Sequence, residues 1–470
     1  MTATKSSQSR TTAELVELDR RHVIHPFLPG AVPHRVVMSR GLGCHLWDRD
    51  GTRYLDASGG LWIGQVGHGR DELAAAAAKQ IRELEYSTCF GNLTHERVIE
   101  LATRLVALAP PGLERVFFTS GGSEANEAAL RMARYYRHRR GESDRTIVLA
   151  RRASYHGFGY GSGTMTGPGP QHFGFGPMLP DVVHLTPPMP NHTELFDGQD
   201  PTDYCVRELE QTIERLGAER ITALIGEPVF GVSGSHVPPD DYWRRIEAVL
   251  RQHGILLIFD EVITAYGRVG HWFGAERYGV EPDLIVTAKG ITSGYQPLGA
   301  VLVSEQIGEV LAQQGGVPFG PTYTGHPVAC AVALANLEIL EREHLLDRAD
   351  VIGGRILDCL RDLMTLPNVD HVRGVGMMIG IELVRDPDTR EPIAGIEGIG
   401  LQNEIRRQCG VLVRVAGNNL MISPPLVMSE SEADEVVAAI RWALEGGVAL
   451  GIAEELPGAG KYVLTAPDAA

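Results

Sequence analysis

The sequence predicts an α/β fold with a large domain built on a mostly parallel sheet, plus a smaller α+β domain. Between residues 115 and 288, short apolar runs alternate with helical segments, which is typical of a parallel sheet covered by helices. A long helix at 326–343 follows, and beyond it helices mix with short strands at 380–384 and 411–415. The chain has 470 residues, which suits two or three domains rather than one.

The first predicted unit, residues 1–70, is an N-terminal segment expected to join the small domain. It contains strand-like pieces at 45–48 and 53–56 on either side of an Asp-Gly turn, which predicts a hairpin. Residues 71–330 are expected to form the large domain and residues 331–470 the small C-terminal domain.

Within the large domain, an alanine-rich segment at 71–85 and a second segment at 96–109 are predicted helices. The segment 154–192 is rich in Gly, Pro, His, Phe and Met without a clear period, which predicts a long loop that is either functional or disordered. The alternating pattern predicts the remaining elements: strands at 115–119, 146–150, 221–227, 255–260 and 284–288, and helices at 123–137 and 240–253.

Composition excludes several classes of function. The formal charge is −16 with no basic block, so neither nucleic acid nor an anionic membrane is expected as a partner. The six cysteines are scattered without a C-x-x-C pair, which favours reduced thiols in the cytoplasm over disulfides or a metal site. No apolar stretch resembles a signal peptide or a membrane span.

Lys289 is one of only four lysines among 43 basic residues. It follows the apolar run 284–288, so we expect it at the end of a buried strand, where lost solvation would lower its pKa and make the amine nucleophilic. An arginine could carry the charge but could not form an imine. A lysine that extends to the surface from a strand end is an equally good explanation of this residue alone.

Two other strand ends carry polar groups. The turn containing Gly122 and Ser123 lies between a strand and a helix, where free N–H groups can bind phosphate, although an ordinary turn with Ser123 as the N-cap is the better explanation of this motif alone. The strand 255–260 delivers Asp260, a carboxylate that could pair with a pyridinium nitrogen or cap a turn. Neither the dinucleotide fingerprint nor a Walker A sequence occurs, which argues against NAD and ATP.

Together, a lysine that can form an imine, a phosphate-binding turn and a carboxylate for a ring nitrogen are the groups that bind pyridoxal 5′-phosphate (PLP). Two further residues strengthen the set. Thr322 lies in a hydroxyl-rich turn before a helix. Arg414 lies in an apolar strand, where a guanidinium could bind a substrate carboxylate or simply face outward.

The chain resembles the class III aminotransferases of the ω-amino acid:pyruvate type (ω-transaminases), which have PLP fold type I. The resemblance runs from about residue 25 to 428. It rests on these motifs in this order: Gly60-Leu61-Trp62, residues 120–126, Tyr155-His156-Gly157, Glu227-Pro228, Asp260-Glu261-Val262, residues 288–295, residues 322–327, Arg414 and Pro424-Pro425.

The resemblance implies a role for each matched residue. Lys289 would carry the Schiff base, and Asp260 would bind the pyridine nitrogen. Trp62 and Arg414 would contact the substrate, Arg414 through its carboxylate. The remaining cofactor contacts would be Gly122 and Ser123 to the phosphate, Tyr155 stacked on the ring beside the substrate, Val262 on its other face, and Thr322 to the phosphate of a partner subunit.

The implied reaction is a ping-pong transfer of an amino group from an amine or ω-amino acid donor to an oxo-acid acceptor such as pyruvate. The active unit would be a homodimer with shared active sites, or a tetramer. Ile263 replaces a glutamine of many class III enzymes, which fits the pyruvate-using subgroup. Phe158 is bulkier than the small residue usual at its position, and Phe230 replaces a frequent glutamine. The resemblance therefore does not identify the amine donor.

Several alternatives remain at this stage. The same PLP frame serves decarboxylation-dependent transamination, aminomutases and racemases. A dehydrogenase would need the missing dinucleotide loop, and a non-catalytic binding protein would not need Lys289 and Asp260 together.

Overall fold

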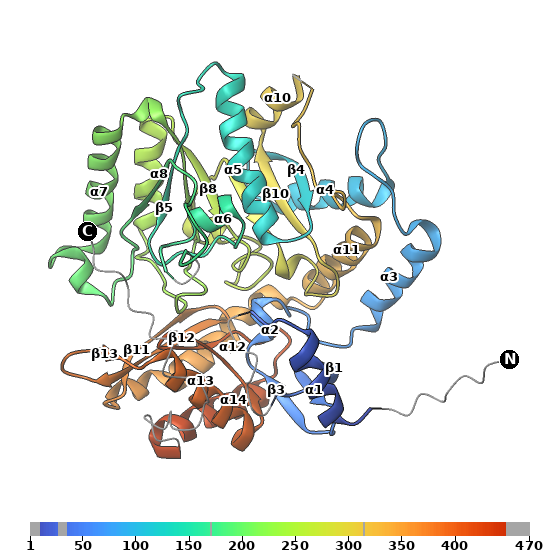
Figure 1. Ribbon diagram of the computed structural model, residues 1–470, viewed down its shortest axis with the longest axis vertical. Coiled ribbons are helices and arrows are strands. Elements are labelled where there is room, and N and C mark those ends of the chain that lie inside the picture. Colours follow the sequence, from blue (N-terminus) through green and yellow to red (C-terminus); the bar gives the residue numbers. More distant parts are fainter. Residues whose placement is uncertain (1–9, 27–34, 170–171, 314, 448–470) are drawn as a thin grey trace.

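A computed structural model describes residues 10–26, 35–169, 172–313 and 315–447 (Figure 1). Its central sheet has seven strands in the order β4-β10-β9-β8-β7-β5-β6. β10 is antiparallel to both of its neighbours, and the pairs from β9 through to β6 are parallel, which confirms the predicted mostly parallel sheet. The strands are β4 (Leu113–Thr119), β5 (Ile147–Arg151), β6 (Val182–Leu185), β7 (Ile221–Gly226), β8 (Leu256–Asp260), β9 (Leu284–Thr287) and β10 (Gly299–Ser304).

Helices surround this sheet in the upper part of Figure 1. α5 places the fully buried Ala125, Ala129 and Ala133 against the sheet, where small side chains allow close packing. Trp243 of α8 packs over Gly226 of β7. Only glycine permits this contact, because a Cβ at position 226 would lie 2.4 Å from the indole. The helices are α3 (Asp71–Leu84), α4 (Glu96–Leu108), α5 (Gly122–Arg139), α6 (Tyr160–Met165), α7 (Pro201–Leu216), α8 (Tyr242–Gln252), α9 (Gly274–Tyr278), α10 (Glu305–Gln313) and α11 (Pro327–Arg342).

A second sheet, which we call the C-terminal sheet, lies below the first in Figure 1. It is antiparallel and consists of β11 (Val369–Val375), β12 (Met378–Asp386), β13 (Glu391–Pro392), β15 (Arg414–Ala416) and β16 (Asn419–Ile422). It packs with α12 (Leu345–Leu360), α13 (Gly395–Glu404) and α14 (Glu430–Trp442). The predicted α+β character of this part is confirmed.

The N-terminal elements lie beside α14 in Figure 1. They are α1 (Thr12–His22), β1 (Met38–Leu42), β2 (His45–Asp48), β3 (Arg53–Asp56) and α2 (Gly59–Trp62). The predicted hairpin is confirmed as β2 and β3, and β3 pairs in parallel with β14 (Val411–Leu412) from the far end of the chain. The predicted boundaries at residues 70 and 330 stay predictions, and residues 1–9, 27–34 and 448–470 lie outside the described residues.

Two sequence predictions were wrong. The segment expected as one strand at 411–415 is divided between β14 and β15, because the chain passes there from the N-terminal sheet to the C-terminal sheet. The segment 154–192 is not structureless, since it contains α6 and β6. α6 is held by Glu127, whose carboxylate accepts from the N–H and hydroxyl of Ser162, a long-range contact without a periodic signal.

Among the described helices, none combines the length and the hydropathy that crossing a bilayer requires. The candidate functional residues lie at the carboxyl edge of the central sheet, where α/β folds bind their ligands. Asp260 ends β8, Glu227 follows β7, and Lys289 comes two positions after β9.

Candidate active site

Asp260 is held in a fixed orientation at the end of β8. Its Oδ2 accepts hydrogen bonds from Asn126 Nδ2 at 2.8 Å and from His156 Nδ1 at 2.7 Å. Its Oδ1 accepts from the Val262 N–H at 3.1 Å. The carboxylate is only 4% exposed, so these donors compensate for the water it has lost. His156 keeps a buried Nε2 without a hydrogen-bond partner among the described residues.

Lys289 begins a short 3₁₀ turn directly after the β9 strand region. Its φ of 44° is left-handed, a conformation that is costly for a non-glycine residue and is found preferentially at functional positions. Burial lowers the pKa of the amine to about 8, against the opposing charges of Asp260 and Glu227, while Arg414 lowers it further. The neutral amine is therefore accessible near physiological pH, as the sequence predicted.

The phosphate-binding turn is tightly packed. α5 begins at Gly122, which leaves the first N–H groups of that helix free to bind an anion. A Cβ on Gly122 would lie 3.0 Å from both methyl groups of Val262, so the turn and Val262 are in contact. A Cβ on Gly157 would lie 2.7 Å from Ser123 Oγ, which places this hydroxyl next to the segment that carries Tyr155.

Lys289 and Arg414 both lie close to the ring of Trp62. Lys289 Nζ lies 5.5 Å from the centroid of the Trp62 ring, and the Arg414 guanidinium carbon lies 5.3 Å from it. The ring is 1% exposed, and burial lowers the pKa of Arg414 while the nearby Tyr155 hydroxyl raises it. Within the described residues, the buried Trp62 Nε1 and Arg414 Nε have no hydrogen-bond partner, so both donors are free for a ligand.

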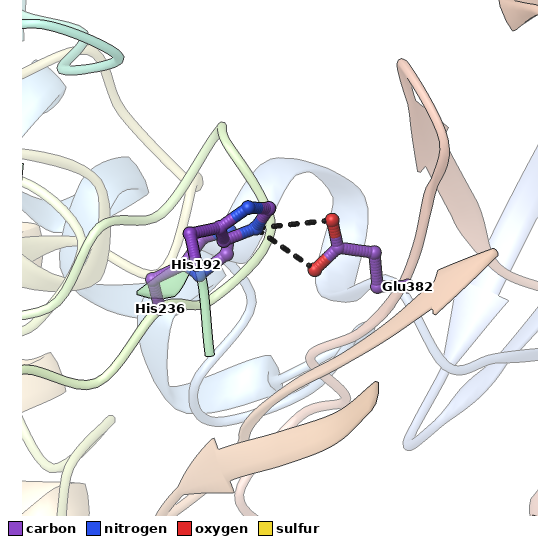
Figure 2. Close-up of side chains that lie close together, drawn as sticks. All are labelled: His192, His236 and Glu382. Atoms are coloured by element: carbon purple, nitrogen blue, oxygen red, sulfur yellow. Dashed lines mark hydrogen bonds and ion pairs between the residues drawn. The ribbon is translucent and has the colours of Figure 1, made fainter. Parts of the chain in front are cut away.

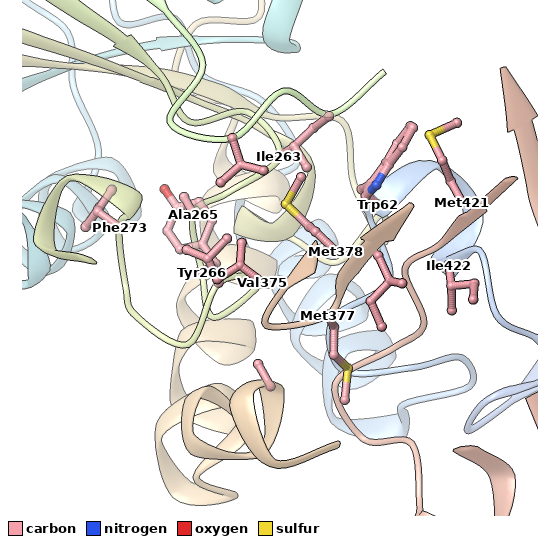
Figure 3. Close-up of a cluster of buried hydrophobic side chains, with 14 of the residues drawn as sticks. Trp62, Ile263, Ala265, Tyr266, Phe273, Val375, Met377, Met378, Met421 and Ile422 are labelled. Atoms are coloured by element: carbon pink, nitrogen blue, oxygen red, sulfur yellow. The ribbon is translucent and has the colours of Figure 1, made fainter. Parts of the chain in front are cut away.

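A cluster of buried apolar side chains lies on one side of this site. Figure 3 shows Trp62 beside Met421, with Ile263 and Met378 nearby in the same buried cluster. Met378 belongs to β12 and Met421 to β16, so the C-terminal sheet contributes to the substrate side of the site. An apolar surface with few polar groups is typical of a small-molecule pocket.

Sequence reasoning gave no role to Glu227, which is 4% exposed. Its Oε1 accepts from the Tyr155 N–H and its Oε2 from the Gly231 N–H, both at 2.9 Å. Burial raises its pKa to about 7, with His156 opposing and Asp260 adding to the rise. In the sequence, only the Glu227-Pro228 motif pointed to this residue. His156 was part of the motif Tyr155-His156-Gly157. Asn126 was the last residue of the motif at 120–126.

Among the nine predicted site residues, Thr322 alone has no contact with this group within the described residues. It is exposed, and its carbonyl accepts a hydrogen bond from the Tyr86 hydroxyl at 2.9 Å. The other eight, namely Trp62, Gly122, Ser123, Tyr155, Asp260, Val262, Lys289 and Arg414, are linked to one another by the contacts above.

The donor set fits PLP. Lys289 provides an amine of lowered pKa for the aldehyde, Asp260 provides a fixed carboxylate for the ring nitrogen, and the α5 N-terminus provides N–H groups for the phosphate. Gly122 keeps this cradle free of side-chain atoms where Val262 leaves no room for them. Such a site defines a PLP enzyme of fold type I.

Comparison with known proteins gives the family. Residues 29–444 match the model of the class III aminotransferases, and the chain belongs to this family. It is 38% identical over 446 residues to the putrescine–pyruvate aminotransferase of Pseudomonas aeruginosa, covering 92% of this chain and 96% of that protein. Enzymes of this class use PLP and transfer amino groups, so the predicted cofactor and the predicted type of reaction are confirmed.

Two solved structures are similar throughout. An (S)-enantioselective ω-transaminase from Thermomicrobium roseum is 44% identical with a TM-score of 0.91, and the match covers 94% of this chain and 100% of that one. An amine transaminase from an uncultivated Pseudomonas species, in a PLP-bound form, is 42% identical with a TM-score of 0.87 over 90% and 98% of the two chains. The predicted ω-transaminase resemblance and the fold type are confirmed.

Proposed function

We propose that this aminotransferase moves an amino group from an amine or ω-amino acid to an oxo acid, with pyruvate as the acceptor. The observation that carries the proposal is the position of Arg414 on the Trp62 ring that Lys289 also faces. A guanidinium there can bind the carboxylate of an oxo acid while the reacting carbon lies near the lysine. The names of the related putrescine–pyruvate aminotransferase and amine transaminase support this choice of substrates.

PLP, when bound, supplies a conjugated ring that accepts electrons from the reacting carbon. Lys289 transfers the proton. Because its pKa is about 8, part of the amine is neutral and can accept the proton from the carbon that bears nitrogen, and the protonated amine can then donate that proton again. Asp260 would bind the ring nitrogen through its carboxylate, whose orientation is fixed by Asn126 and His156 at Oδ2 and by the Val262 N–H at Oδ1. A fixed anion at this place favours a protonated ring nitrogen.

The two substrates make different demands on the pocket. An oxo acid would use the free Nε of the Arg414 guanidinium together with the Trp62 Nε1. An uncharged amine would use only the apolar wall that includes Met421 and Ile263 (Figure 3). Stacking on Trp62 gives the guanidinium a stable position when no carboxylate is present, since cation–π contacts contribute about 0.5–2 kcal/mol.

The test uses purified protein with PLP, a panel of amines and pyruvate. We expect alanine to form from at least one donor, and amine alone to convert the enzyme once and then stop. Turnover of amine without any acceptor would favour a racemase or an aminomutase, and release of CO₂ with each turnover would favour decarboxylation-dependent transamination. Either result would contradict the proposal.

We also propose a homodimer with shared active sites. Large apolar side chains are exposed around Thr322: Tyr323 is 59% exposed, Phe90 50% and Leu93 58%, and the Tyr86 ring lies 6.3 Å from that of Tyr323. Such a patch on a monomer is typical of a protein interface. Thr322 lies on it and would reach the phosphate bound by the second copy.

The assembly is tested by sedimentation of the wild type and of Tyr323→Asp. We expect the wild type to be a dimer or a tetramer, and the variant to dissociate and lose PLP affinity. A monomeric wild type with full PLP content would contradict the shared site.

For localisation, all six cysteines are unpaired in the structure, which supports the predicted reducing compartment, the cytoplasm.

A further inference from the structure

The loop of residues 227–236 connects the carboxyl edge of the central sheet with the C-terminal sheet. At its base, Glu227 binds the N–H groups of Tyr155 and Gly231. The loop is closed by a bridge in which the Phe230 N–H donates to the His236 carbonyl at 3.0 Å. A Cβ on Gly231 would lie 2.3 Å from Ile263 Cδ1, so this part of the loop packs directly on a residue of the pocket wall.

The tip of the loop interlocks with the C-terminal sheet. A Cβ on Gly380 of β12 would lie 2.1 Å from the Gly234 carbonyl oxygen. A Cβ on Gly234, which has a φ of 122°, would lie 2.6 Å from Arg373 Nη2 and 2.3 Å from Asn419 Oδ1. Glycine is therefore required on both sides of this contact, and the approach is closer than any side chain would permit.

Arg373 joins the tip of the loop to the C-terminal sheet. Its Nε donates to the Gly234 carbonyl at 2.9 Å, and its Nη1 donates to Glu382 Oε2 at 2.8 Å. Its Nη2 lies 2.9 Å from His236 Nε2 and also binds Asn419 Oδ1. With 7% exposure, this guanidinium is a buried charge whose partners lie in the loop and in the C-terminal sheet.

Glu382 has a second set of contacts. His192 Nε2 lies 3.1 Å from Glu382 Oε1 (Figure 2). Asn191 Nδ2 donates to Glu382 Oε2 at 3.0 Å. Burial alone would raise the pKa of Glu382, but the hydrogen bond from His192 and the charge of Arg373 outweigh it and lower the pKa. The carboxylate is thus ionised and binds segments from both halves of the fold.

His192, His236 and Glu382 have the spacing of a metal site, with their candidate ligand atoms within 4.8 Å of one another. The contacts argue against that use. Arg373 lies against both His236 Nε2 and Glu382, so a divalent cation would have to displace a buried guanidinium. Charge and hydrogen bonding identify the group as an ion-pair network between the C-terminal sheet and the segments that carry His192 and His236.

We propose that Arg373 and Glu382 are positioning residues for the substrate pocket. Arg373 holds the tip of the 227–236 loop, Glu382 fixes Arg373, and Glu227 holds the base of the loop, so that together they set Gly231 against Ile263 and Tyr155 in its place. Arg373 and Glu382 thereby adjust donor specificity without touching the substrate themselves. This inference rests on the proposed function, because it assigns the pocket to the amine donor.

The first experiment measures hydrogen exchange of residues 228–236 in the PLP-loaded and PLP-free protein. Arg373→Lys keeps the charge but cannot reproduce the fork of contacts, so we expect exchange of this loop to rise about tenfold in both forms. Glu382→Gln, which is close to isosteric, should act in the same direction to a smaller extent and guards against a failure of Arg373→Lys to fold. Unchanged exchange in both variants would overturn the proposal.

The second experiment compares kcat/KM for a compact and a bulky amine donor. We expect the ratio between the two donors to shift about fivefold or more in Arg373→Lys, with PLP content unchanged. Arg348→Lys is the matched control: Arg348 also donates to backbone carbonyls, those of Leu426 and Met428, but does not contact the loop. Equal losses for both donors, as from general destabilisation, would overturn the assignment.

The two outcomes separate the inference from the proposed function. If the wild type shows no amino transfer with any donor, the proposed function fails, and the exchange data still decide whether Arg373 holds the loop. If amino transfer is present but the donor ratio does not respond, the positioning role alone is refuted.

Discussion

Replacement of Arg414 by alanine should separate the two half-reactions of this enzyme. The guanidinium is partly buried, stacks on Trp62 at 5.3 Å, and has an Nε without a protein partner in the described structure. Its capacity to bind a carboxylate is therefore not already used by another side chain. An uncharged amine gains nothing from this charge, whereas an oxo acid depends on it.

The size of the effect follows from the bonds that would be lost. A hydrogen bond to a charged group contributes about 1.5–3 kcal/mol, and a guanidinium can form two such bonds with a carboxylate. Because Arg414→Ala opens space that water can enter, we take a net loss of about 2–3 kcal/mol, which corresponds to a fall of roughly 30- to 150-fold in kcat/KM for pyruvate. For an uncharged arylalkyl amine, we expect a change of less than about threefold.

The assay is stopped-flow spectroscopy of each half-reaction, with amine alone on the PLP form and pyruvate alone on the amino form. Arg385→Ala is the control, because Arg385 is an exposed arginine of β12 that pairs with Glu397 at 2.7 Å away from the pocket. Equal losses in both half-reactions would refute the carboxylate role of Arg414.

Three further predictions concern other residues. Lys289→Ala should lower turnover by roughly 10⁴-fold or more and abolish fixation of PLP by borohydride; substantial residual activity of the purified variant would disprove its role in proton transfer. Asp260→Asn should weaken PLP binding and lower kcat by at least roughly 10²-fold, measured by titration of the cofactor absorbance, and an unchanged spectrum and rate would contradict its contact with the ring. The pKa of His192 is raised by its hydrogen bond to Glu382, against the effect of burial. The stabilisation of the folded state by protonated His192 should therefore be complete below the pKa of about 6.5 that this histidine has in the unfolded chain. It should be lost as the pH rises through the higher pKa that the histidine has in the folded protein. The Tm difference between wild type and His192→Gln should narrow over that window, and a pH-independent difference would refute it.

The central sheet and the cofactor residues were predictable because their signals are local. Strands β8 and β9 are continuous apolar runs, and Asp260 and Lys289 stand where those runs end. The glycine turn before α5 is equally visible in sequence. Each of these features depends on neighbours within a few positions along the chain.

The remaining features depend on contacts between distant segments. Glu227 accepts a hydrogen bond from the N–H of Tyr155, 72 positions away, and Arg373 donates one to the carbonyl of Gly234, 139 positions away. No periodicity or propensity reports such pairs. The division between β14 and β15 was missed for the same reason, since only the position of β3 determines which sheet receives each half.

The pairing of β3 with β14 has a consequence for the order of assembly. Ser423 donates to the Ser58 carbonyl across 365 positions of sequence, and Trp62 and Arg414 lie near the two ends of that span. During synthesis, Asp260 and Lys289 emerge long before Arg414, so the cofactor groups exist while the carboxylate-binding half of the pocket is still missing. Of the predicted site residues, Arg414 is therefore the last to be synthesised.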